Sequence, residues 1–128
     1  MAFNILIVDD SRVTRAMIDK TIRLAEVDVG EMYQAANGQE ALDVMAEHWV
    51  DLVFADINMP VMTGMELIAK MSENEAMKSI PVVVVTTEGS STRIEELRQK
   101  GVAAYLRKPF QPEELATAVH QVLGTPHA

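Results

Sequence analysis

Five short apolar runs divide the chain, and longer stretches with helical spacing separate them. The runs cover residues 3–8, 32–36, 52–55, 80–85 and 102–106. The first, third and fourth runs are continuous rather than alternating, which is typical of parallel strands buried on both faces. The second and fifth runs are less strongly apolar, so we expect them at the edges of the sheet.

Helix-start signals and amphipathic stripes fill the stretches between the runs. Asn37 with Glu40 forms an Asn-led capping box, Thr63 with Glu66 forms another, and Pro112 followed by two acids opens the last helix. The stripes that follow are Ala41, Val44, Met45 and His48; Leu67, Ile68 and Met71; and Leu115, Ala118, Val119 and Val122. Two more helices are marked by Met17, Ile18, Ile22 and Ala25, and by Ile94 and Leu97, closed by Gly101.

Strand and helix alternate five times, with no linker, repeat or low-complexity stretch between them. This order predicts an α/β fold: a doubly wound five-stranded parallel sheet with helices on both faces, forming a single domain over residues 1–128. In open sheets of this kind, ligands bind beyond the carboxyl ends of the strands. The residues that follow each run are therefore the candidates for chemistry.

Polar side chains follow four of the five predicted strands within two residues. Asp9 and Asp10 come after the first strand, Asp56 after the third, Thr86 after the fourth and Lys108 after the fifth. If the strand order is 2-1-3-4-5, as in flavodoxin-like sheets, strands one and three are neighbours. The three carboxylates then converge and repel one another unless a cation joins them. Mg²⁺ prefers such oxygen ligands and adds phosphate oxygens, while an ammonium and a hydroxyl can bind a phosphoryl group.

Each of these residues also has an ordinary explanation when it is taken alone. Asp10 and Ser11 are common helix N-caps, and Asp56 could start a turn. Lysines such as Lys108 are usually solvated, and Thr86 could be satisfied by backbone. The specific signal is the joint pattern, in which an acid pair, a lone acid, a hydroxyl and a lysine each follow a separate strand.

The composition narrows the class of protein. Apolar residues are 48% and charged residues 23%, as in a globular domain, and the absence of cysteine excludes disulfides, zinc–thiolate sites and thiol nucleophiles. No apolar run approaches the roughly 20 residues of a membrane span, and no basic leader precedes the first run, so we expect a cytoplasmic protein. The net charge of −8 argues against a nucleic-acid or anionic membrane surface.

Four segments, "LIVDDS", "DLVFADINMPVMTGMEL", "IPVVVVTTEGS" and "AAYLRKPF", together closely resemble the receiver domain of bacterial response regulators. The nearest type is the single-domain chemotaxis (CheY-like) receiver. The resemblance covers about residues 5–123 and implies a (βα)5 receiver fold that takes a phosphoryl group from a sensor histidine kinase. Asp56 matches the phosphoacceptor, Asp9 and Asp10 match the acid pair that organises Mg²⁺, and the backbone carbonyl of Asn58 would be a further metal ligand.

The resemblance also implies a switch that passes the signal on. Thr86 matches the hydroxyl that moves onto the phosphoryl group, Lys108 the lysine that pairs with that group, and Tyr105 the aromatic switch. We expect the change on the face built from the fourth helix, the fifth strand and the last helix, where residues 88–110 hold five basic and three acidic residues. A downstream protein would bind there, with the flagellar motor switch as one candidate. The chain itself is expected to be a monomer and not an enzyme.

Two functions from other classes compete with this hypothesis. A Mg²⁺-dependent phosphohydrolase of the haloacid-dehalogenase type needs an aspartate two residues after its nucleophile as general acid/base, and Asn58 stands there. A flavodoxin-like FMN carrier would place its phosphate against Asp9 and Asp10, which repel it. Within the receiver class, a phosphate sink and a phosphorelay intermediate stay open. Only "TPHA" follows the last helix, so output is expected from a separate protein.

Overall fold

The structure is a computed structural model, and it describes residues 2–25, 27–57, 61–86, 95–96, 99, 102–108 and 110–123. The strands in this part are β1 (Phe3–Val8), β2 (Val29–Ala35), β3 (Leu52–Ala55), β4 (Val82–Thr86) and β5 (Ala104–Arg107). The helices are α1 (Arg12–Leu24), α2 (Gly38–Glu47), α3 (Gly64–Ser72) and α5 (Pro112–Leu123). Of the helix predicted around Ile94 and Leu97, residues 95–96 and 99 are described and are helical, whereas Ile94 and Leu97 lie outside the described residues.

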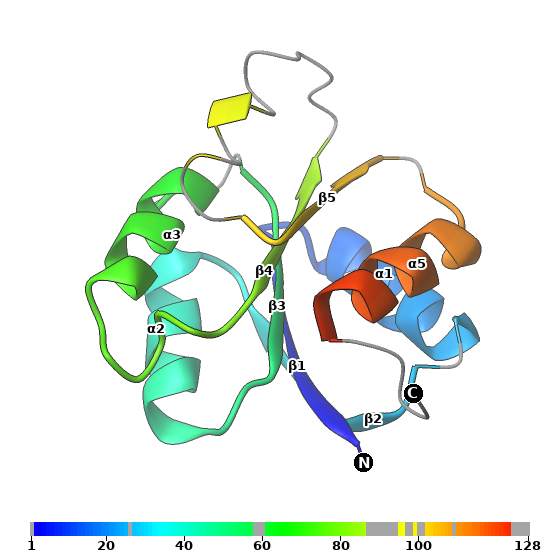
Figure 1. Cartoon of the computed structure of the whole chain (residues 1–128), viewed down its shortest axis with the longest axis horizontal. Coiled ribbons are helices and arrows are strands. Elements are labelled where there is room, and N and C mark those ends of the chain that lie inside the picture. The colour runs from blue at the N-terminus through cyan, green and yellow to red at the C-terminus, as the bar shows by residue number, and fades with distance from the viewer. Residues whose placement is uncertain are drawn as a thin grey trace.

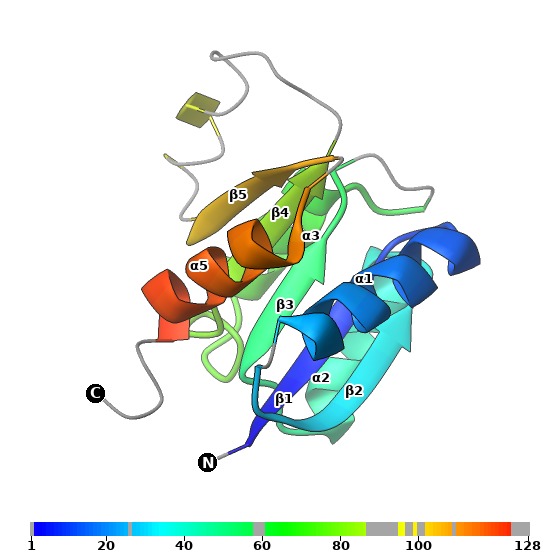
Figure 2. The ribbon, with the colours of Figure 1, turned by 90° about the vertical axis from the view of Figure 1, so that its right-hand side faces the viewer.

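The strands form one parallel sheet in the order β2-β1-β3-β4-β5. Helices α2 and α3 cover one face of the sheet, and α1 and α5 cover the other (Figures 1 and 2). The predicted fold class is therefore confirmed, with β2 and β5 at the edges as expected. No helix in the described part of the chain is long and apolar enough to cross a membrane.

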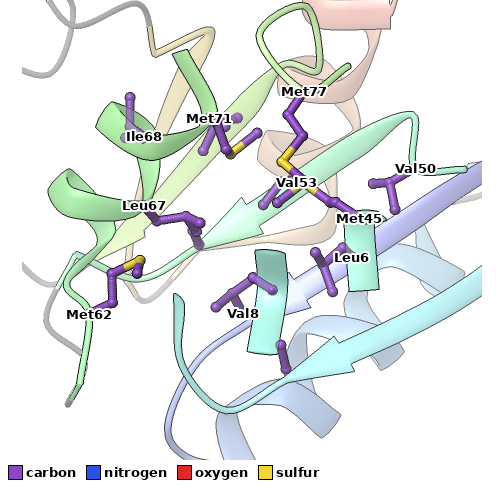
Figure 3. Close-up of a cluster of buried hydrophobic side chains, with 14 of the residues drawn as sticks. Leu6, Val8, Met45, Val50, Val53, Met62, Leu67, Ile68, Met71 and Met77 are labelled. Carbon is purple, nitrogen blue, oxygen red and sulfur yellow. The ribbon is translucent and has the colours of Figure 1, made fainter. Parts of the chain in front are cut away.

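The central strands bury both of their faces. In β1, Leu6 and Val8 pack with residues of α2 and α3, while Ile5 and Ile7 pack with α1 and α5. Figure 3 shows the first of these clusters, to which α2 contributes Met45 and α3 contributes Leu67, Ile68 and Met71. Two-sided burial explains why β1 and β3 are continuous apolar runs, and both have the predicted bounds.

The edge strand β2 is longer than predicted. It begins at Val29 rather than residue 32, because the register shifts between Phe3 and Ile5 of β1 and the exposed Gly30 and Glu31 are accommodated there. An edge strand that buries little carries a weak hydrophobic signal. In a second difference, Met17 of α1 is not in the core as predicted but 46% exposed, and the buried stripe of that helix is Ile18 and Ile22.

Two predicted helix starts can be checked atom by atom. Thr63 and Glu66 form the reciprocal capping box, with Glu66 N–H donating to Thr63 Oγ1 at 3.2 Å and Thr63 N–H donating to the Glu66 carboxylate at 3.1 Å. Asn37 does cap α2, but the Glu40 carboxylate accepts from the N–H of Ala36 rather than from that of Asn37. In the capping box of α2, the backbone N–H that pairs with Glu40 is therefore that of the residue before the N-cap.

Candidate functional site

Four charged side chains lie together at the carboxyl ends of β1, β3 and β5. Val8 and Ala55 are paired in the β1–β3 ladder, so the residues that follow them leave the sheet side by side. The N–H of Asp56 donates to the carbonyl of Val8 at 3.1 Å, and the N–H of Asp9 donates to Ala35 of β2 at the same distance. Backbone pairing thus fixes where the two aspartates begin.

The carboxylates of Asp9, Asp10 and Asp56 each offer an oxygen within 4.8 Å of the others. Asp9 is 2% exposed, the Asp56 side chain is 14% exposed, and Asp10 faces solvent. Three convergent carboxylates, one of them open to water, form a hard oxygen donor set that fits Mg²⁺. The cluster that the strand ends predicted is therefore brought together by the fold.

Lys108, the residue after β5, reaches across the strand ends to this cluster. Its Nζ lies 3.2 Å from Asp9 Oδ2 and 3.3 Å from Asp56 Oδ2, and its side chain is only 17% exposed. The ammonium offsets part of the repulsion between the two carboxylates, which burial would otherwise strengthen. Lys108 is thus a member of the site rather than a solvated surface charge.

Arg15 on α1 is a site residue that sequence reasoning missed. Its guanidinium donates to the backbone carbonyl of Asp9, and its Nε donates to the Gln34 side chain of β2 at 3.1 Å. Ser11 N–H donates to Asp9 Oδ1 at 2.9 Å, so Asp9 is held through both its backbone and its side chain. One sequence signal could have pointed to this role. Arg15 is the fourth residue of α1, and a positive charge near a helix N-terminus is unfavourable unless its guanidinium has a hydrogen-bond acceptor nearby.

Gly64, the first residue of α3, lies directly against the segment that carries Asp56. Its N–H donates to the carbonyl of Ile57 at 2.8 Å. A Cβ added to Gly64 would lie 2.4 Å from the carbonyl oxygen of Asp56 and 2.9 Å from the Cα of Ile57, both backbone atoms. The glycine is therefore needed for α3 to approach the strand end this closely.

Val61, in the same connection, has a backbone φ of 69° and a side chain that is 80% exposed. A β-branched residue is strained in this left-handed region, and no burial offsets the strain. We expect Val61→Asn to raise the free energy of unfolding by about 1 kcal/mol, because asparagine tolerates positive φ. Denaturant unfolding measures this, with Val13→Asn as the control.

Val13 is equally exposed, at 79%, but it lies in the helix α1. Asparagine there removes no strain, and valine and asparagine have similar helix propensities, so we expect little change in the free energy of unfolding. Stabilisation of both variants to the same extent would show that the gain at position 61 does not come from its backbone.

The remaining predicted site residues are placed only in part. Tyr105 of β5 is opposite Val84 in the ladder, and its side chain packs against the cluster between the sheet and α2 and α3. Thr86 ends β4 and is opposite Arg107 in register, but its side chain is not among the described features. Asn58 lies outside the described residues. The structure therefore assembles the acids and the lysine, and leaves the metal role of Asn58 and the switch roles as predictions.

The three aspartates and the lysine of this site lie within a stretch of the chain that matches a known family of domains. Residues 5–120 match the response regulator receiver domain. The chain belongs to this family. The receiver domain matched here includes every element from the middle of β1 to most of α5.

Known receivers of chemotaxis systems are similar to this one over nearly their whole length. The chain is 36% identical to chemotaxis protein CheY1 of Helicobacter pylori, over 94% of this chain and 97% of that protein. It is also 36% identical to the two-component response regulator ORR5 of rice, over 94% and 88% of the two chains. The solved structure of CheY4 of Vibrio cholerae superposes with a TM-score of 0.84 at 34% identity, covering 95% of this chain and 99% of that one. The protein is a receiver of the CheY type.

Proposed function

We propose that this receiver accepts a phosphoryl group on Asp56 from a sensor histidine kinase, with Mg²⁺, and signals by binding another protein when phosphorylated. The observation that carries the proposal is the arrangement of Lys108 between Asp9 and Asp56, with the oxygens of Asp9, Asp10 and Asp56 within 4.8 Å of one another. Similarity to chemotaxis protein CheY1 of Helicobacter pylori supports a signalling role of this kind.

The donor set decides which ion the site would hold. Asp9, Asp10 and Asp56, with the carbonyl of Asn58 as a further proposed ligand, would bind Mg²⁺ and leave positions for water and phosphoryl oxygens. Bound there, the ion would supply positive charge to the oxygens of the transferring group. Among the residues that the structure describes, no other group of three or more His, Cys, Asp or Glu side chains lies close enough together to hold a metal ion.

The chain's own residues account for the remaining steps. A carboxylate oxygen of Asp56 attacks the phosphorus, the P–N bond of the phosphohistidine breaks, and its electron pair returns to the imidazole nitrogen, which takes up a proton. Lys108 now donates to Asp56 Oδ2 and is placed to donate to a phosphoryl oxygen instead. Arg15 and the N–H of Ser11 hold Asp9, so the acid pair keeps its orientation while charge moves at Asp56.

Signal output is proposed to pass through Thr86 and Tyr105. A phosphoryl group adds strong acceptors beside the end of β4, where Thr86 would gain a partner. Tyr105 lies on β5, next to β4 in the sheet, so a change at the end of β4 would reach the face built from β5, α5 and the helix predicted between β4 and β5. The downstream protein would bind this face, as a motor switch or another target.

Phosphorylation with a small phosphodonor tests the proposal directly. With acetyl phosphate and Mg²⁺, the wild-type protein is expected to gain the mass of one phosphoryl group in intact mass spectrometry. With EDTA in place of Mg²⁺ the gain should be lost, because the carboxylates then repel the incoming phosphate. Equal labelling in EDTA would contradict the metal role.

The same samples separate a receiver from a phosphohydrolase. A receiver is expected to take up one phosphoryl group from acetyl phosphate and to leave p-nitrophenyl phosphate unhydrolysed, whereas a haloacid-dehalogenase-type enzyme would turn over p-nitrophenyl phosphate continuously. The second behaviour needs a titratable acid/base two residues after the nucleophile, and Asn58 stands there. Sustained turnover of p-nitrophenyl phosphate that depends on Asp56 would contradict the receiver mechanism and favour the phosphohydrolase.

A further inference from the structure

A pocket of about 230 Å³ opens at the end of the sheet opposite the acidic site. Its position follows from the chain, because Asp51 precedes β3 and Pro81 precedes β4, whereas Asp56 follows β3. This is the end at which β1 begins, marked N in Figure 1. Its walls are apolar at Met45, Val50, Ile80 and Pro81. Its polar lining includes Trp49, Asp51 and His48, whose ring is stacked on that of Tyr33.

Asp51 is held in one orientation at this pocket. Its Oδ1 accepts from the indole N–H of Trp49 at 2.8 Å, and its Oδ2 accepts from the N–H of Asn4 at 2.8 Å. The backbone repeats the link, since Asp51 N–H donates to the Asn4 carbonyl at 2.8 Å and the Asn4 amide donates to the Trp49 carbonyl at 3.0 Å. These four hydrogen bonds fix a carboxylate and an indole side by side.

The indole of Trp49 is exposed despite this anchoring. The residue is 77% exposed, although tryptophan is one of the largest apolar side chains and its N–H is already satisfied. A carboxylate accepts up to about four hydrogen bonds, so Asp51 keeps acceptor capacity beyond the two that it uses. An exposed π-face and a fixed carboxylate are the two groups that a planar cation requires.

Charge around the pocket favours the same kind of ligand. Four carboxylates lie on the lining segments or within two residues of them, at positions 43, 47, 51 and 75. The one lysine or arginine within that span is Lys78, whose Nζ is paired with Glu75 at 2.9 Å. Of these four carboxylates, Asp51 is the one that lines the pocket. The pocket thus combines a carboxylate with apolar walls, which suits a side chain with a methylene stem and a cationic head.

We propose that this pocket binds an arginine side chain of a partner protein, with the guanidinium stacked on Trp49 and paired with Asp51. The guanidinium group is planar, so it can stack on an indole and pair with a carboxylate through two parallel hydrogen bonds. The lysine ammonium is not planar and can make neither of these contacts. Because the pocket is at the far end of the sheet from Asp56, docking there would leave the acidic site open. A partner could then bind the receiver in both its phosphorylated and its unphosphorylated form. Such binding would be a function in addition to the proposed phosphoryl transfer.

A blocked tripeptide with a central arginine is the probe, and Trp49 is the reporter. It is the single tryptophan of the chain, so its indole N–H gives one NMR signal and its emission is unambiguous. We expect a saturable shift with the arginine peptide, a smaller one with lysine, and none with the uncharged isostere citrulline. An equal response to citrulline would overturn the proposal, and so would an indole signal that changes with protein concentration alone, which would assign the pocket to a second copy of the chain.

Two substitutions of equal charge test the geometry. Asp51→Asn is expected to weaken arginine binding roughly tenfold or more, since it removes the paired charge. Asp43→Asn removes the same charge from exposed α2, outside the pocket lining, and should leave binding nearly unchanged. If both substitutions weaken arginine binding equally, the attraction is a general effect of charge, and the proposed site is wrong.

A third variant guards against loss of folding in Asp51→Asn. Ala76 is exposed, lines the pocket and takes no part in the hydrogen bonds of Asp51, so Ala76→Gln narrows the pocket without touching the carboxylate. It should also weaken binding, and unchanged binding would overturn the proposal. Phosphorylation by acetyl phosphate, measured on the same variants, should persist in all three, so failure here and failure of the proposed function are distinguishable.

Discussion

Asp56→Asn is expected to lower the rate of phosphorylation by acetyl phosphate by roughly 10³-fold or more, to a level that intact mass spectrometry does not detect. The amide is not a nucleophile, and the cluster loses one of the three carboxylates that lie within 4.8 Å of one another. The fold should survive, because the change removes one of three converging negative charges while Lys108 keeps its pairing with Asp9.

The matched control for this substitution is Asp51→Asn. Asp51 stands immediately before β3 and Asp56 immediately after it, so the two variants remove the same charge from opposite ends of one strand. Only the variant at the carboxyl end should lose phosphorylation. A phosphoryl group retained in Asp56→Asn would assign the acceptor to another residue, and equal loss in both variants would point to damage of the fold rather than of the chemistry.

Gly64→Ala is expected to lower the free energy of unfolding by about 2–4 kcal/mol. The new methyl would meet the carbonyl oxygen of Asp56 at 2.4 Å and the Cα of Ile57 at 2.9 Å, and backbone cannot move aside as a side chain does. Relief requires α3 to shift away from the strand end, which also displaces Asp56. Thermal or denaturant unfolding should show the loss, and phosphorylation at saturating Mg²⁺ should slow as well.

Gly38→Ala provides the comparison, because Gly38 is the first residue of α2 as Gly64 is of α3. Both substitutions place alanine at the same helical position, so any gain in helix propensity is shared. At Gly38 the close atoms are Cγ and Sδ of Met62, both at 2.7 Å, and its Cβ at 2.8 Å. A rotamer change moves the first two, and the Cβ moves only with the backbone of Met62. We expect a smaller loss of stability than at Gly64, and an equal loss at both sites would mean that contact with the Asp56 segment is not the cause.

The resting site and the activated site differ in what Lys108 contacts. In the structure its ammonium links Asp9 and Asp56, and after transfer a phosphoryl group would compete for it. The lysine would thereby exchange a carboxylate partner for a more highly charged one, which is the kind of local electrostatic change that biases a two-state element. The pairing described here is thus part of the proposed switch as well as of its chemistry.

The fold class could be predicted from the sequence because the signals for it are local or periodic. Strands buried on both faces are mostly apolar, so β1 and β3 could be delimited to the residue, whereas β4, predicted at 80–85, spans Val82–Thr86. Thr63 and Glu66 carry their capping box within four residues. The acids and the lysine could be nominated because they follow strands, and parallel strands bring their carboxyl ends to one edge.

Tertiary structure decided the features that depend on contacts between distant segments. Asn4 and Glu31 meet only through pairing of β1 with β2, and the sequence near residue 29 shows no apolar pattern that predicts a strand start. Arg15 reaches the Asp9 carbonyl and Gln34 because α1 packs beside β2. Lys108 is separated by 99 and 52 residues from the two carboxylates that it pairs with. Burial and charge pairing at such positions depend on the surrounding segments, so the residue types alone do not specify them.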